Sequence, residues 1–137
     1  MTMDAAALQA TLEELGAEYT KRLGLRVKTA APGEVTLTLP VTPELIHGGG
    51  VVCGQAILAA ADTTMLLAMI AQLGEFRPMT TVQLQASFLR PVPREVASIV
   101  VIGRVLRFGK SLSYGEVEFK TTDGKLAAHA TTTYALL

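Results

Sequence analysis

The sequence predicts an α+β domain in which a curved antiparallel sheet wraps one long helix. The chain has 137 residues, and half of them are hydrophobic. Most apolar residues recur at every second position, whereas residues 54–73 are apolar almost without interruption. The first pattern is typical of strands with one buried face, and the second of a helix enclosed on all sides. Because a compact chain of this length buries roughly two thirds of its surface around one core, we expect a single domain over residues 1–137.

The N-terminal quarter predicts a short helix followed by a hairpin. Residues 4–16 are rich in helix formers, and Gly16 follows the last apolar position. This pattern is typical of a short amphipathic helix. From Leu25 onward apolar residues alternate with polar ones, and Pro32 and Gly33 interrupt the alternation as turn residues do.

Residues 54–73 predict a long central helix, which Gly74 ends. A helix that is apolar on every side must be covered by other elements. Its most apolar stretch, residues 56–71, has Asp62 near its middle and is shorter than the roughly 20 apolar residues that span a bilayer. We therefore expect a buried core helix and no membrane association.

Alternation predicts four further strands, at residues 79–89, 95–107, 111–121 and 125–136. Three breaks separate them: Pro91-Val92-Pro93, Gly109-Lys110 and Asp123-Gly124. The last pair has the residue types that a type I′ hairpin turn requires. The pattern thus predicts three antiparallel connections.

Composition excludes several classes of function. The 12 Lys and Arg balance 12 Asp and Glu, no run of five like charges exists, and Trp is absent, so we expect no nucleic-acid partner. Two distant histidines and one cysteine predict no metal site. The glycine run lacks the Lys-Ser/Thr of a phosphate-binding loop. The single cysteine and an N-terminus without a signal-peptide pattern predict a cytoplasmic protein.

Residues 47–64, HGGGVVCGQAILAAADTT, contain the features that indicate chemistry. Glycines at 48–50 permit positive φ or a close approach to a ligand. Gly54, at the start of the predicted helix, leaves first-turn N–H groups uncovered. Such donors, together with the positive end of the helix dipole, would stabilise a polarised carbonyl oxygen.

Asp62 lies two turns inside this apolar helix, where a charged carboxylate is costly to bury without partners. Either it accepts hydrogen bonds from Thr63, Thr64 or a loop, or faces water, or it is a functional carboxylate in a cleft. Gly54 and Asp62 are eight residues apart, about 12 Å along a helix, too far for both to contact one reacting carbon. If both are catalytic they act from different subunits, in a symmetric dimer whose helices run antiparallel or cross.

The same window resembles the hotdog-fold acyl-CoA thioesterases of the phenylacetic-acid-degradation type, which are related to one lineage of 4-hydroxybenzoyl-CoA thioesterases. Their motif is N-x-x-G-x-x-H-G-G, then six residues and an acid, often within L-A-D-T. The motif positions fall, in order, on His47, Gly50, Cys53, Gly54, Gln55 and Asp62, and Thr63 completes A-A-D-T. The resemblance continues through TTVQLQASFLRPVP and RVLRFGKSLSYGEVEF, and so covers most of the chain.

Three positions depart from that motif: His47 replaces Asn, Cys53 replaces His and Gln55 replaces Gly. The acid and the glycine at the helix start are retained. A bacterial subgroup of the family has R-P-G-G-T-V-S-G-P before L-A-D, so a residue other than His at position 53 is compatible with activity.

The resemblance implies a role for each motif residue. Asp62 would be the general base that activates water, or a nucleophile that forms a mixed anhydride. The Gly54 N–H would hold the thioester oxygen. His47 would hydrogen-bond the thioester carbonyl or the water, or alternatively order its loop. The residues expected to contact substrate are Gly50, Cys53, Gln55 and Thr63, with Arg90, Arg107 and Lys110 as candidates for the CoA phosphates.

Two isolated residues have simpler interpretations. Cys53 near a helix N-terminus could be a reactive thiol, but no paired base is evident, which favours a small, partly buried residue. His129 alternates with apolar neighbours in the last strand and is interpreted as structural.

The sequence therefore predicts an α+β hotdog domain that hydrolyses medium-chain or aryl acyl-CoA to the acid and CoA. It needs no separate cofactor, because CoA is part of the substrate. We expect a homodimer, assembling as a dimer of dimers. A hotdog hydratase is disfavoured because residues 63–73 contain no His. The alternative from another class is a non-catalytic acyl-CoA-binding or scaffold protein of the same fold.

Overall fold

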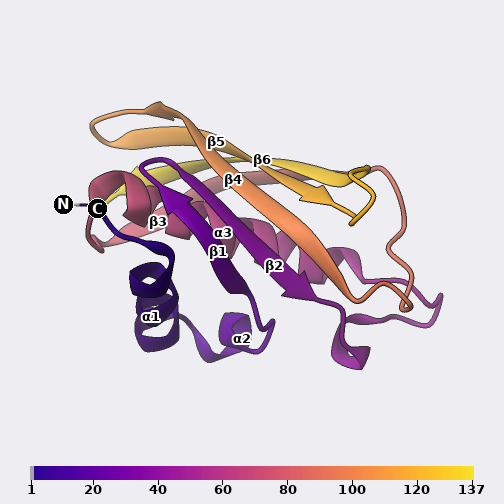
Figure 1. Ribbon diagram of the computed structural model, residues 1–137. Helices are drawn as coiled ribbons and strands as arrows, with labels where there is room; N and C mark the ends of the chain where they lie inside the picture. The colour runs from indigo at the N-terminus through magenta and orange to yellow at the C-terminus, as the bar shows by residue number, and fades with distance from the viewer. Residues whose placement is uncertain (1) are drawn as a thin grey trace.

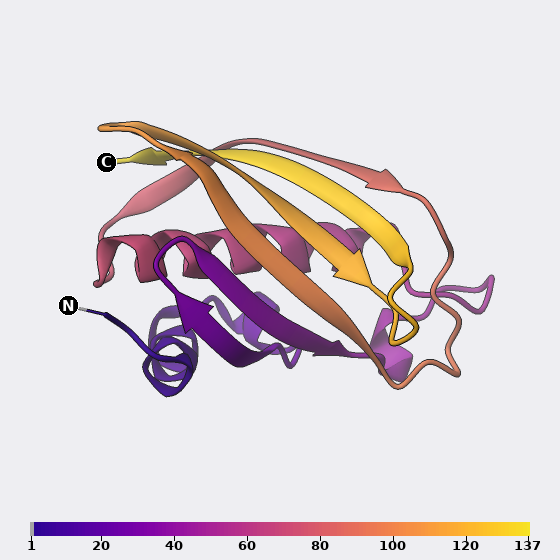
Figure 2. The ribbon, with the colours of Figure 1, turned by 45° about the horizontal axis from the view of Figure 1, so that its top comes forward.

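The computed structural model describes residues 2–137 as a six-stranded antiparallel sheet that curves around one long helix (Figures 1 and 2). The strand order in the sheet is β1-β2-β4-β5-β6-β3. The elements along the chain are α1 (Ala5–Leu15), α2 (Glu18–Lys21), β1 (Arg26–Ala31), β2 (Glu34–Pro40), the 3-10 turn η1 (Pro43–Leu45), α3 (Gly54–Leu73), β3 (Met79–Phe88), β4 (Ser98–Phe108), β5 (Leu112–Lys120) and β6 (Leu126–Leu136).

The central helix α3 has the bounds that the sequence predicts. Gly74 ends it in the left-handed conformation, with φ of 81°, and its N–H donates to the Ile70 carbonyl. By length and composition α3 could cross a membrane, but 67% of its most apolar window is buried inside this domain. The sheet supplies the cover that an apolar helix requires.

The core lies between α3 and the concave face of the sheet. Alternate residues of four strands point inward and are fully buried, among them Val35, Leu37, Leu39, Ile99, Val101, Val117 and Phe119. At Gly115 the helix approaches the sheet so closely that a Cβ would collide with the Met65 side chain, and it would also lie 2.5 Å from the Arg104 carbonyl oxygen of the neighbouring strand β4. The side chain of Met65, on α3, fills that space. Glycine at this position therefore sets the distance between helix and sheet.

One predicted connection is wrong. β1 and β2, β4 and β5, and β5 and β6 form the expected antiparallel pairs, but β3 pairs with β6 and not with β4. The chain from β3 to β4 passes through Pro91 and Pro93, where the Val52 N–H donates to the Val92 carbonyl and Val51 bridges to Pro93. This segment therefore pairs with the loop before α3, and β3 becomes an edge strand with one neighbour.

The predicted type I′ turn is also wrong. Gly124 has φ of 84°, but no residue other than glycine has positive φ among residues 2–137, so Asp123 does not. The Thr121 N–H donates to the Lys125 carbonyl, and the Gly124 N–H donates to the Thr121 carbonyl. The connection is a three-residue loop that ends in a left-handed glycine.

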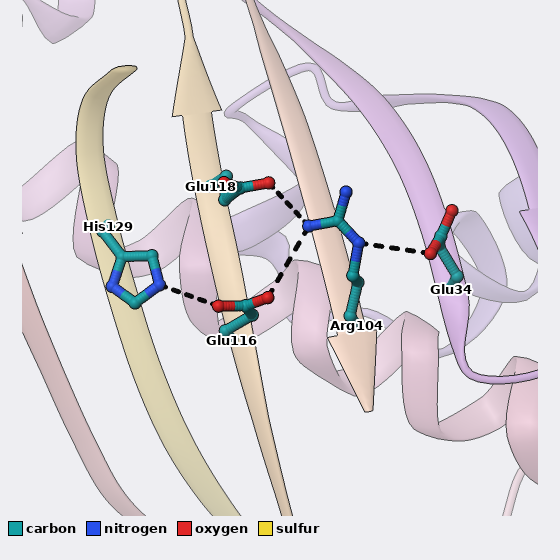
Figure 3. Close-up of polar contacts among 5 residues, drawn as sticks. All are labelled: Glu34, Arg104, Glu116, Glu118 and His129. Carbon is teal, nitrogen blue, oxygen red and sulfur yellow. Dashed lines mark hydrogen bonds and ion pairs between the residues drawn. The ribbon is translucent and has the colours of Figure 1, made fainter. Parts of the chain in front are cut away.

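A charged network crosses the convex face of the sheet (Figure 3). Arg104 donates from Nη1 to Glu118 at 2.6 Å and from Nε to Glu34 at 3.2 Å, and its Nη1 lies 3.7 Å from Glu116. Glu116 also pairs with His129 Nε2 at 3.0 Å. The Arg104 hydrogen bond lowers the pKa of Glu118, and Glu118 raises the pKa of Arg104. The network links β2, β4, β5 and β6, and the position of His129 within it agrees with a structural role.

Candidate active site

The loop before α3 is ordered by its own hydrogen bonds. The His47 N–H donates to the Val51 carbonyl, and the Gly50 N–H donates to the His47 carbonyl. Gly50 has φ of 82°, a conformation that glycine adopts without strain. The Gly49 N–H donates to His47 Nδ1 at 2.8 Å, and the His47 side chain is otherwise exposed. In this structure the His47 ring orders its own loop. This agrees with one of the two roles considered for His47 from the sequence, the other being a hydrogen bond to the thioester carbonyl or the water.

The N-terminus of α3 presents an unpaired backbone donor. Cys53 is the N-cap, with φ of −71° and ψ of 149°, and makes no side-chain capping bond. Gly54 is the first helical residue, and among residues 2–137 no oxygen accepts its N–H. The positive end of the helix dipole adds to this donor. The position can therefore stabilise negative charge on a ligand oxygen.

Two cavities flank this helix end. One, of about 310 Å³, is lined by Tyr19, Arg22, Leu23, Glu44, Leu45, Cys53, Gln55 and Ala56. The other, of about 410 Å³, is lined by Val51, Val52, Gly54, Ile57 and residues 88–92. Cys53 and Gln55 thus face one cavity, whereas Gly54 and Arg90 face the other. His47 lies in a third cavity, of about 350 Å³, beside Arg94.

Asp62 is half-buried between α3 and the sheet, and its carboxylate has two hydroxyl partners. Thr81 Oγ1 donates to Asp62 Oδ1 at 2.7 Å, and the Tyr134 hydroxyl lies 2.6 Å from the same oxygen. The Tyr134 hydroxyl also lies 2.8 Å from the Asp62 carbonyl oxygen. No donor among residues 2–137 contacts Asp62 Oδ2. One carboxylate oxygen is held by the protein, and the other is free for a ligand.

The hydroxyl donors that the sequence offers beside Asp62 do not bond to it. Thr63 Oγ1 donates to the Ala59 carbonyl at 2.9 Å, within the helix. Thr64 Oγ1 is buried without a partner among residues 2–137. Hydrogen bonds from Thr63 and Thr64 to Asp62, one of the sequence interpretations, are therefore wrong. Both threonine side chains are buried and point away from the Asp62 carboxylate.

Sequence reasoning missed Thr81 and Tyr134. They lie opposite each other in the β3–β6 register, on the concave face that covers Asp62. Tyr134 is 4% exposed, and burial together with the Asp62 charge raises the pKa of its phenol. The alternation of the last strand places Tyr134 inward, but only the pairing of β3 with β6 brings Thr81 beside it.

The other predicted site residues are dispersed. Gly54 and Asp62 lie two turns apart on α3, as the spacing requires. Arg90 is exposed beside the Gly54 cavity, where it donates to the Leu126 carbonyl at 2.9 Å. Arg107 and Lys110 lie at the β4–β5 hairpin, at the opposite end of the sheet (Figure 2). Within residues 2–137 no group of three or more His, Cys, Asp or Glu side chains could hold a metal ion.

Comparison with known proteins identifies the family. A model of the thioesterase superfamily matches residues 49–128, which include Gly54, Asp62 and Thr81. The chain belongs to the thioesterase superfamily. A Saccharolobus solfataricus protein named "Putative esterase" is 32% identical over 117 residues, which are 85% of this chain and 81% of that protein. Thioester hydrolysis is therefore the general activity of this chain, and the enzyme is a hydrolase.

Solved structures confirm the hotdog fold. The Escherichia coli PaaI protein from the phenylacetic acid degradation operon has a TM-score of 0.83 and 20% identity, covering 97% of this chain and 93% of that one. A Streptococcus mutans protein bound to acetyl CoA has a TM-score of 0.76 and 18% identity, covering 82% and 88%. Both share the arrangement of a curved sheet around one central helix, as the sequence predicts for this thioesterase.

Proposed function

We propose that this thioesterase hydrolyses acyl-CoA at two equivalent sites of a homodimer, each formed by Gly54 of one subunit and Asp62 of the other. The observation that supports this most is the pair of unsatisfied groups on α3. The Gly54 N–H has no acceptor, and Asp62 Oδ2 has no donor, among residues 2–137. About 12 Å of rigid helix separates them, so one thioester can meet both groups only across two subunits.

In the proposed reaction, water attacks the thioester carbonyl carbon while Asp62 accepts its proton. The negative charge that develops on the carbonyl oxygen is stabilised by the Gly54 N–H and the helix dipole. The C–S bond then breaks, and the CoA thiolate takes the proton from Asp62 to leave as the thiol. If Asp62 attacks the carbon instead, the C–S bond breaks to give a mixed anhydride, which water hydrolyses. Both routes use an ionised carboxylate with one free oxygen.

The free edge of β3 is the surface that we propose for the dimer. Near one end of β3, Thr81 contacts Asp62, and at the other end the Phe88 ring lies over Gly54. An antiparallel pairing of two β3 strands, centred between Leu84 and Gln85, would place Thr81 opposite the partner's Phe88. Support comes from the single neighbour of β3 in the sheet and from the spacing of Gly54 and Asp62, which requires two subunits if both act on one thioester. This pairing would bring Asp62 to the partner's helix start.

The two cavities at the helix start would hold the two halves of the substrate. We place the acyl group in the cavity of Cys53 and Gln55, which Leu23 and Leu45 make largely apolar and which suits a medium-chain or aryl group. The CoA moiety would follow the cavity beside Gly54 toward Arg90, whose guanidinium suits a phosphate. The Streptococcus mutans protein of the same fold, bound to acetyl CoA, supports a CoA ester as ligand.

The twofold arrangement also bears on the remaining basic residues. In the proposed antiparallel pairing of the two β3 strands, the sheets of the two subunits run in opposite directions. The hairpin with Arg107 and Lys110 of one subunit would therefore lie at the same end of the dimer as Arg90 of the other. We keep all three as candidates for the CoA phosphates. A dimer of dimers and a cytoplasmic location stay predictions.

The experiment that tests the function is CoA release from short, medium, long and aryl acyl-CoA by the wild type and by Asp62→Asn. Free thiol is measured against a protein-only blank, because Cys53 is itself a free thiol. We expect turnover by the wild type and a loss to background in Asp62→Asn, with unchanged thermal unfolding. Hydrolysis by Asp62→Asn at the wild-type rate would contradict the mechanism. Saturable binding of CoA esters without turnover by the wild type would favour a non-catalytic binding protein.

A further inference from the structure

The contacts of Tyr134 fix the orientation of the Asp62 carboxylate. Its hydroxyl lies 2.6 Å from Asp62 Oδ1 and 2.8 Å from the carbonyl oxygen of the same residue. A single group that contacts both the main chain and the side chain of one residue restricts the side-chain torsions between them. Tyr134 belongs to β6 and Asp62 to α3, so the phenol also joins the helix to the sheet.

The phenol of Tyr134 can serve only as a neutral donor to the carboxylate. It is almost fully buried, and burial and the nearby negative charge both raise its pKa. The hydroxyl proton is therefore present at every pH at which a thioesterase works. Donation to a charged acceptor in a buried site is stronger than the same bond between neutral groups.

The second donor, Thr81, completes an asymmetric environment for the carboxylate. Both hydroxyl groups contact Oδ1, and no donor among residues 2–137 contacts Oδ2. The protein therefore stabilises negative charge on one oxygen and leaves the lone pairs of the other directed away from these bonds. The reactive position of Asp62 is Oδ2, and its direction depends on how firmly Oδ1 is held.

We propose that Tyr134 is a positioning residue of the thioesterase site, which fixes the Asp62 carboxylate through Oδ1 and directs its Oδ2 toward the thioester and water. This inference rests on the proposed function of Asp62 and adds a residue to it. Tyr134 contacts neither substrate nor water in this role and acts through Asp62 alone.

The test compares Tyr134→Phe, which removes only the hydroxyl, with Tyr114→Phe as a matched control. Tyr114 is exposed on the convex face, away from Asp62. We expect kcat of Tyr134→Phe to fall about ten- to a hundredfold, as loss of one bond to a charged group predicts, while KM changes little. Tyr114→Phe should match the wild type in both respects.

Two outcomes overturn the inference. If the wild type turns over acyl-CoA but Tyr134→Phe keeps its kcat within twofold, Tyr134 does not position Asp62, and the proposed function stands. If the wild type itself shows no turnover, the proposed function fails and the inference fails with it.

A second measurement covers the case in which Tyr134→Phe does not fold. Incorporation of 3-fluorotyrosine at all three tyrosines keeps every hydroxyl but makes each phenol a stronger donor. In a background in which Tyr19 and Tyr114 are phenylalanine, only Tyr134 carries the fluorine. We expect kcat to differ from that of the same background with unmodified tyrosine, because the bond that holds Asp62 Oδ1 is altered, and an unchanged kcat would overturn the inference.

Discussion

Replacement of Gly54 by proline would remove the proposed oxyanion donor while keeping the start of the helix. Gly54 is the first residue of α3, a position that proline favours because the N–H there has no partner within the helix. Cys53, with φ of −71° and ψ of 149°, already has the extended conformation required before proline. The substitution therefore deletes the N–H without disturbing the start of the helix.

The magnitude follows from the loss of one donor. Removal of a single oxyanion-hole donor costs about a hundred- to a thousandfold in kcat, and we expect that loss in Gly54→Pro. The free energy of unfolding should change by no more than about 1 kcal/mol, since the position tolerates proline. The assay is steady-state CoA release together with urea unfolding of each variant.

Gly54→Ala is the matched control, because it keeps the N–H. An alanine Cβ would lie 3.3 Å from the Phe88 ring, a close contact that a small rotation of this half-exposed side chain relieves. We expect Gly54→Ala to retain kcat within about fivefold. If Gly54→Pro hydrolyses acyl-CoA as fast as Gly54→Ala, the Gly54 N–H does not stabilise the thioester oxygen, and the reasoning from the helix start is refuted.

Two further predictions concern subunit sharing and pH. Mixed, re-equilibrated Asp62→Asn and Gly54→Pro chains should recover about a quarter of the wild-type activity, because half the dimers are mixed and each has one intact site; no recovery despite mass-spectrometric proof of mixed dimers would exclude sharing. The hydrogen bond from Arg104 lowers the pKa of Glu118 below its ordinary value of 4.5. The folded state gains stability from this group above that value and loses it as pH falls through the lower, folded pKa. Glu118→Gln should therefore be less stable than the wild type by about 0.5–1 kcal/mol at pH 7 in urea unfolding, and this difference should shrink as the pH is lowered below 4.5; a difference that does not change with pH would contradict this.

The central helix and the strands could be predicted from the sequence because their signals are local. Residues 54–73 are apolar on every face of the helix. In a small domain such a helix is covered only if it lies within the curve of the sheet. Gly74 and Gly33 adopt the positive φ that glycine allows, so they end the helix and turn the first hairpin as expected. The sheet supplies most of the cover that the helix needs, and α1 and α2 also contact it.

The pairing of β3 with β6 could not be predicted in the same way. The alternation of β3 fits either neighbour equally well, and the choice depends on closure of the sheet around α3, which is a property of the whole chain. The partners of Asp62 were missed for the same reason. Thr81 is 19 residues away and Tyr134 is 72 residues away, and only the β3–β6 register places their hydroxyl groups together.

The three departures from the family motif fall where they disturb the proposed chemistry least. His47, Cys53 and Gln55 lie in the loop or on the first turn of α3, and the structure places their side chains in its cavities or against their own loop. The proposed oxyanion donor is a backbone N–H, which any residue except proline supplies, and its direction is set by the helix. Side-chain changes around Gly54 can therefore alter which acyl group fits while the donor is preserved. Asp62 cannot be replaced in the same way, because its proposed function depends on the carboxylate itself and on the two hydroxyl groups that hold one of its oxygens.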